Sequence, residues 1–169
     1  MDVELATAFA FGAVAIAFVA FAVVSVVLAV IDLRTHRLPN RIVGAGYVIA
    51  VSSLGVAAIA AHDGGAAMRS FGAGAVLFGA LLVVRIVDPR AIGGGDVKLA
   101  GLIGLHLGWL GWDTVVLGSM FAFAGAGLFA LVLVLMRRRG FGVRIAFGPW
   151  LLGGAWAAIA LTVAAMTIG

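Results

Sequence analysis

Six apolar segments, separated by short loops, take up nearly all of this chain. A helix that spans a membrane requires about 20 mostly apolar residues, and the segments that come near this length are residues 5–31, 42–61, 70–87, 97–112, 114–136 and 146–168. Only 11% of the 169 residues are charged and 64% are hydrophobic, a composition that does not suit a soluble domain. Inside a bilayer each segment must satisfy its own backbone polar groups. We therefore predict an all-α, polytopic membrane helix bundle of about six transmembrane helices, forming a single domain over residues 1–169.

The basic residues gather in alternate loops. Ten of the eleven Lys and Arg residues lie in the loops 32–41, 85–98 and 137–144, and only Arg69 lies on the other side. Because short cytoplasmic loops are rich in Lys and Arg, these three loops are predicted to face the cytoplasm and both termini the outside. The formal charge of +4 then follows from topology, and the expected partner is the lipid bilayer rather than nucleic acid. The chain has no Cys, which excludes disulfides and thiolate metal sites.

Two of the seven acidic residues stand at the ends of apolar segments. Asp32 follows the first segment, and Asp96 precedes the fourth. Two segments lie between them, so both aspartates are expected on the same face of the membrane, whichever face that is. Asp113 follows the fourth segment and is expected on the opposite face. An ionisable group at a membrane boundary is costly to keep and marks a candidate functional site.

Each aspartate also has a purely structural explanation. Asp32 could be a polar anchor that closes the first helix, balanced by Arg34. Asp96 could cap the N-terminus of the fourth helix, because Asp is a preferred residue at that position. Their common face and the sequences around them favour a function for the pair.

Neighbouring carboxyl groups can carry out hydrolysis. Two close carboxyls cannot both ionise cheaply, so one keeps a proton. The ionised one can deprotonate a water molecule, and the protonated one can hydrogen-bond a scissile carbonyl. Which of them holds the proton is a property of the coupled pair. The three histidines, His36, His62 and His106, lie on different loops or faces without metal-ligand spacing, so neither a metal nor another cofactor is predicted.

Two sequence blocks around these aspartates are similar to those of a known family. Asp32-Leu-Arg-Thr-His-Arg-Leu-Pro39-Asn40 resembles the first block of prepilin peptidases, also called type IV leader peptidases. Gly93-Gly94-Gly95-Asp96-Val97-Lys98-Leu99 resembles their Gly-x-Gly-Asp-x-Lys-Leu block, and Phe147-Gly148-Pro149 is a weaker likeness to a late Phe-Gly-Pro segment. The two aspartate blocks together are specific, whereas either one alone is weak.

The resemblance implies an intramembrane aspartic endopeptidase of the Gly-x-Gly-Asp type in the cytoplasmic membrane. Such enzymes remove the basic leader of type IV pilin-like precursors, for pilus assembly or protein secretion, at the cytoplasmic membrane face. It also implies that Asp32 and Asp96 are catalytic, with substrate-binding or supporting roles for Gly93, Gly95, Lys98, Pro39 and Asn40. Larger members carry a cysteine-containing insertion associated with N-methylation. This chain lacks Cys and such an insertion, so it resembles the compact members, and no methyltransferase activity is expected.

Two other classes of protein also place carboxyls in membranes. Presenilin-like proteases share Gly-x-Gly-Asp but pair Tyr with Asp and contain Pro-Ala-Leu, whereas Ile31 precedes Asp32 here and no Pro-Ala-Leu is present. A small proton-coupled transporter, or a structural membrane subunit, could use the same aspartates. A transporter site usually lies near the bilayer midplane among broken helices, so the depth of the aspartates distinguishes it from the peptidase.

Overall fold

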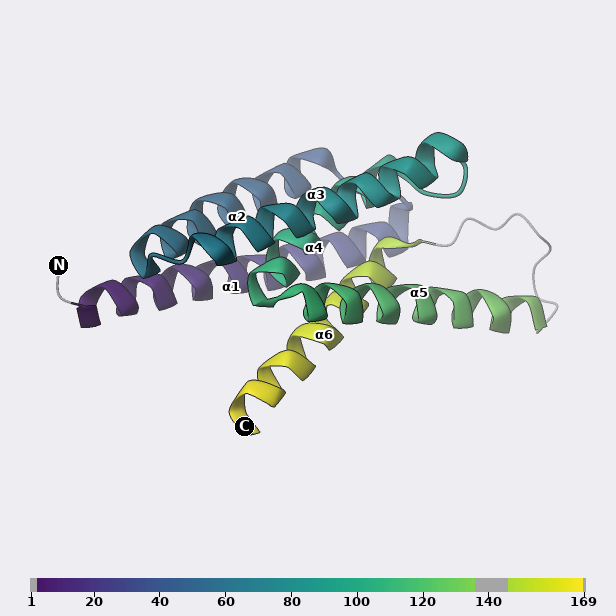
Figure 1. Cartoon of the computed structure of the whole chain (residues 1–169). Helices are drawn as coiled ribbons and strands as arrows, with labels where there is room; N and C mark the ends of the chain where they lie inside the picture. Colours follow the sequence, from purple (N-terminus) through teal and green to yellow (C-terminus); the bar gives the residue numbers. More distant parts are fainter. Residues whose placement is uncertain (1–2, 136–145, 169) are drawn as a thin grey trace.

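The computed structural model describes residues 3–135 and 146–168, and this part of the chain is folded into six α-helices without a strand (Figure 1). The helices are α1 (Val3–Thr35), α2 (Asn40–Ala61), α3 (Gly64–Val87), α4 (Gly94–Leu110), α5 (Trp112–Leu135) and α6 (Gly148–Ile168). All but α4 are long and apolar enough to cross a membrane. The predicted polytopic helical membrane bundle is confirmed. The basic loop 137–144, with Arg137, Arg138, Arg139 and Arg144, lies outside the described residues.

α1 and α3 extend furthest beyond the predicted apolar segments. α1 continues to Thr35, so Asp32 is a helical residue and not part of a loop. The helix ends where His36 takes a left-handed backbone conformation, with φ of 52°. α3 begins at Gly64 because Asp63 caps it, accepting a hydrogen bond of 2.8 Å from the Ala66 N–H.

α4 is a short helix enclosed by the others. It has 17 residues and packs antiparallel to α3 as a tight hairpin (Figure 1). A Cβ at Gly104 would stand 2.5 Å from the Ala73 carbonyl oxygen, and one at Gly108 would stand 2.5 Å from that of Arg69. Glycine therefore lets the two backbones approach closely, as small residues do in membrane helix pairs. This packing explains why the fourth segment is rich in glycine.

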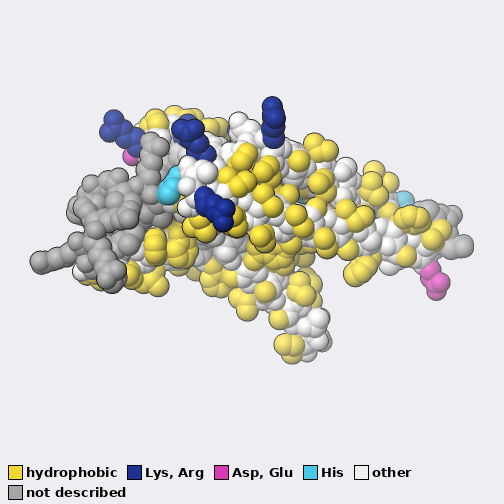
Figure 2. Space-filling model, turned by 180° about the vertical axis from the view of Figure 1, so that it is seen from behind, with side chains coloured by type: hydrophobic (Ala, Val, Ile, Leu, Met, Phe, Trp, Pro, Cys, Tyr) yellow, Lys and Arg dark blue, Asp and Glu magenta, His cyan; other side chains and the backbone are white. Residues whose placement is uncertain are grey.

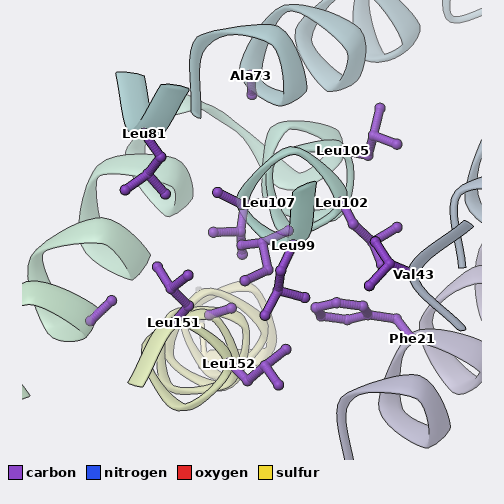
Figure 3. Packing of buried hydrophobic residues seen from close by; sticks show 14 of the residues in the cluster. Phe21, Val43, Ala73, Leu81, Leu99, Leu102, Leu105, Leu107, Leu151 and Leu152 are labelled. Atoms are coloured by element: carbon purple, nitrogen blue, oxygen red, sulfur yellow. The ribbon is translucent and has the colours of Figure 1, made fainter. Parts of the chain in front are cut away.

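The apolar core forms around α4. Leu99, Leu102 and Leu107 of this helix are fully buried, and side chains from α1, α2, α3 and α6 converge on them (Figure 3). The outer faces are also apolar: Phe11 of α1 is 77% exposed and Val83 of α3 is 60% exposed. Hydrophobic side chains cover most of the face seen in Figure 2. Such an exterior suits lipid as the surrounding solvent.

Successive helices alternate in direction. α1, α3 and α5 run one way and α2, α4 and α6 run back, so the α1–α2 and α3–α4 loops lie at one end of the bundle (Figure 1). On the face seen in Figure 2, Lys and Arg side chains gather toward this end. The end of α1 and the start of α4 therefore meet where positive charge is concentrated.

Candidate active site

The structure brings Asp32 and Asp96 together at this end of the bundle. Asp32 lies in the last turns of α1 and is 4% exposed, while Asp96 lies in the first turn of α4 and is 9% exposed. Both carboxyls face Gly148, the first residue of α6. From the point where a Cβ on Gly148 would stand, Asp32 Oδ2 is 2.7 Å away and Asp96 Oδ1 is 3.5 Å away. The distance between Asp32 Oδ2 and Asp96 Oδ1 is therefore no more than the sum of these two distances.

Asp96 is fixed by the local geometry of α4. Gly93 is the N-cap residue, and its N–H donates to Asp96 Oδ2 over 3.3 Å. Asp96 is therefore the third residue of the helix, bonding back to the cap, and not the cap itself. Burial, and after it the negative charge of Asp32, raises the pKa of Asp96 to about 6, while the Gly93 N–H acts in the opposite sense.

The Asp32 carboxyl has fewer hydrogen-bond partners than the Asp96 carboxyl. Its Oδ2 is buried and has no hydrogen-bond partner among the described residues. Arg34, the expected counter-charge, is exposed to the surroundings. A buried carboxyl oxygen without a partner is costly for folding, and such atoms in native structures call for an explanation beyond packing. Asp32 Oδ2 therefore has an unused hydrogen-bond acceptor beside Gly148 and Asp96.

The supporting residues connect the two aspartate blocks. Lys98 Nζ donates to Asn40 Oδ1 over 2.9 Å, and the Tyr47 hydroxyl donates to the Lys98 carbonyl over 2.8 Å. Pro39 is the N-cap of α2, and its carbonyl accepts the N–H groups of the first turn. The first half of α2 is thereby joined to α4, two residues after Asp96. Tyr47 was not predicted from the sequence, although it is the single tyrosine of the chain.

The three consecutive glycines before Asp96 are tightly packed. A Cβ on Gly95 would stand 2.7 Å from Leu38 Cβ, and one on Gly94 would stand 3.3 Å from the Arg85 guanidinium carbon. Arg85 in turn donates to the Ile92 carbonyl over 2.9 Å. These contacts bring the α3–α4 loop close to the residues that follow α1. The glycines thus have a structural use within the protein, in addition to any contact with a substrate.

Two cavities open from the carboxyl pair. One, of about 580 Å³, is lined by both aspartates and by residues of the α1–α2 connection, α3 and the start of α4. Its lining includes His36 and the cationic side chains of Arg37, Arg85 and Lys98. The second, of about 850 Å³, leads from the same pair toward Ala126 of α5 and Phe147. Both volumes fall in the range of ligand sites, and both cavities are lined by Asp32 and Asp96.

The remaining candidate residues lie elsewhere. Asp63 caps α3, and Asp113 begins α5, beyond the end of α4 opposite to Asp96. Asp88 is exposed and accepts the Arg90 N–H over 2.9 Å, as suits a loop residue. His106 is fully buried and stacks on Phe21, with ring centroids 4.1 Å apart. Within residues 3–135 and 146–168, no three His, Asp or Glu side chains come together as a possible metal site.

Fold and site together define a polytopic membrane protein with two buried, facing carboxyls at one end of its bundle. The model of the type IV leader peptidase family matches residues 17–135, a stretch that includes both aspartates. The chain belongs to this family.

A curated relative extends the comparison. The chain is 33% identical over 130 residues to the prepilin leader peptidase/N-methyltransferase of Escherichia coli (strain K12), and the match covers 75% of this chain and 55% of the relative. The chain thus spans about half the length of that protein. No solved structure matches the chain.

Proposed function

We propose that this protein is an aspartic endopeptidase that removes the leader peptide from type IV pilin-like precursors. The observation that carries the proposal is the meeting of the Asp32 and Asp96 carboxyls beside Gly148, in cavities large enough for a peptide. The family match gives independent support, because it includes both residues.

The proposed reaction is a direct attack of water on the scissile peptide bond. The ionised carboxyl of the pair takes a proton from water, and the hydroxyl oxygen bonds to the carbonyl carbon. The protonated carboxyl hydrogen-bonds the carbonyl oxygen and stabilises its developing charge. As the C–N bond breaks, the pair returns a proton to the leaving amine. The raised pKa of Asp96 supports a pair in which one carboxyl stays protonated.

The continuity of α1 favours hydrolysis over proton-coupled transport. α1 runs unbroken from Val3 to Thr35, with Asp32 within its last turns. A transporter site usually lies at the bilayer midplane among interrupted helices. Asp32 and Asp96 instead stand at helix ends, where a leader peptide that precedes a membrane helix would arrive.

The site is proposed to face the cytoplasm from the cytoplasmic membrane. Arg37, Arg85 and Lys98 line the cavity that holds the carboxyls, and a concentration of Lys and Arg favours the cytoplasmic side. We further propose that this chain acts as a peptidase without methyltransferase activity. It has no Cys, whereas the methyltransferase region of larger members is associated with paired cysteines.

The test is cleavage of a co-expressed pilin-like precursor, read as a band shift. The wild-type protein is expected to cleave it, and Asp32→Asn and Asp96→Asn are each expected to abolish cleavage. Asp113→Asn is the matched control, because this exposed aspartate begins α5 at the far end of α4. Cleavage that persists after replacement of either aspartate of the pair would exclude the proposed mechanism.

A further inference from the structure

Gly148 places the backbone of α6 directly against the carboxyl pair. It is buried and is the first residue of the helix. The position of its absent Cβ is 2.7 Å from Asp32 Oδ2, 3.4 Å from Asp32 Cγ and 3.5 Å from Asp96 Oδ1. A side chain here would project toward the place where the two carboxyls face each other.

We propose that Gly148 is a positioning residue of the site, whose missing side chain keeps the gap between the two carboxyls open for water and the scissile carbonyl. This inference rests on the proposed peptidase function. It adds a third element, α6, to a site otherwise built from α1 and α4. The family match ends at residue 135, so the assignment comes from the geometry around Gly148.

Gly148 packs so closely against the Asp32 carboxyl that a methyl group at position 148 has no room. A carbon atom 2.7 Å from a carboxyl oxygen is closer than real Cβ contacts allow, so one of the two groups would have to move. α6 is held in place by the buried Leu151 and Leu152, and Trp156 Nε1 donates to Ser25 Oγ of α1 over 3.1 Å. Because α6 is anchored in this way, the Asp32 carboxyl is the group that would be displaced.

The unpartnered oxygen of Asp32 supports the same conclusion. Asp32 is 4% exposed, and its Oδ2, the atom nearest to the Gly148 Cβ position, has no hydrogen-bond partner in the described part of the chain. This buried oxygen therefore packs directly against the Gly148 backbone, where a methyl group at position 148 would press on it. The Gly148 N–H also lies beside this carboxyl, and alanine keeps that N–H. Gly148→Ala therefore adds a methyl group beside the two carboxyls but keeps the Gly148 N–H as a donor.

Two other glycines of α6 supply matched controls. Gly153 has nothing within 4 Å of its Cβ position, so Gly153→Ala adds the same methyl group in open space. Gly154 has Ala122 N at 2.5 Å and Gly118 O at 2.6 Å from its Cβ position, so Gly154→Ala disturbs the packing of α6 on α5. Gly153 and Gly154 lie inside α6, so their alanine variants share the gain in helix propensity from glycine to alanine, whereas Gly148 is the first helical residue and gains less. Differences among them therefore report their surroundings.

The experiment measures kcat and KM on a purified precursor, together with the folded fraction by size exclusion and the thermal midpoint in detergent. Gly148→Ala is expected to lower kcat per folded molecule by about a hundredfold, as misplacement of reacting groups does, with KM within about twofold of the wild type. Gly153→Ala is expected to keep the wild-type kcat and KM with a thermal midpoint at or above that of the wild type, and Gly154→Ala to lower the thermal midpoint.

The inference is overturned if Gly148→Ala keeps wild-type kcat, raises only KM, or loses activity merely in proportion to lost folded protein. The last result would assign Gly148 to packing, like Gly154. The Asp32→Asn and Asp96→Asn variants separate this inference from the proposed function. If they are inactive and Gly148→Ala is active, the inference alone fails. If they cleave, the peptidase mechanism itself fails.

Discussion

At the scale of single residues, Asp32 and Asp96 have different surroundings although they share one site. Asp96 accepts a backbone hydrogen bond from Gly93 within its own helix turn. Asp32 Oδ2 has no such bond in the described residues. The pair is therefore asymmetric before any substrate binds. Because the charge on Asp32 opposes ionisation of Asp96, replacing Asp32 should change the titration of Asp96.

Asp32→Asn is expected to lower the pKa of Asp96. The negative charge of Asp32 is one of the two influences that raise this pKa to about 6, so its removal makes ionisation of Asp96 easier. Burial remains, so the pKa should stay above the ordinary value of 3.8. Infrared titration of the protonated carboxyl band, assigned by its loss in Asp96→Asn, measures the shift. An unchanged titration in Asp32→Asn, equal to that of Asp113→Asn, would show that the carboxyls do not interact.

At the scale of elements, hydrogen bonds and close backbone contacts set the positions of the helices that carry the site. The Asn40–Lys98 bond connects the start of α2 with α4, two residues after Asp96. Gly104 and Gly108 hold α4 against α3 over the rest of its length. The first interaction is expected to influence catalysis and the second to influence stability.

Asn40→Ala and Lys98→Ala are each expected to lower kcat by roughly threefold to tenfold, the scale of one exposed hydrogen bond. The kcat of the double variant should be no lower than that of the less active single variant, because both changes remove the same hydrogen bond. Arg41→Ala serves as the control, since Arg41 is the exposed neighbour of Asn40 and lines neither of the two cavities. Additive losses in the double variant would mean that Asn40 and Lys98 act separately.

Gly104→Ala is expected to destabilise the bundle by about 1–3 kcal/mol, the usual cost of overpacking. The new methyl group would meet the α3 backbone, with the Ala73 carbonyl oxygen 2.5 Å from the Cβ position. Gly79→Ala on α3 is the control, because nothing lies within 4 Å of its Cβ position. Thermal unfolding in detergent compares the two. Equal midpoints would show that α3 and α4 can separate without cost.

At the scale of the whole molecule, the sequence predicts the helices and their alternation better than it predicts their contacts. Counting the segments between Asp32 and Asp96 was enough to place them at one end of the bundle, because each crossing reverses the chain. The role of Gly148 as a neighbour of both carboxyls depends on how α6 packs, and no periodicity encodes that. The alternative that Asp96 caps α4 is wrong, because Gly93 is the N-cap residue and Asp96 is the third residue of the helix.

The orientation of the whole bundle gives the last prediction. The chain has no Cys, so single cysteines at exposed positions report which side each end faces. Thr35→Cys and Arg90→Cys mark the end that holds the carboxyls, and His62→Cys and Asp113→Cys mark the other end. If the Lys- and Arg-rich end is cytoplasmic, an impermeant maleimide added to intact cells should label positions 62 and 113, and should label positions 35 and 90 only after permeabilisation. The reverse labelling pattern would put the carboxyl pair outside the cell. A pattern in which one position from each end is labelled in intact cells would contradict the alternation of the helices. The meeting of Asp32 with Asp96 depends on that alternation.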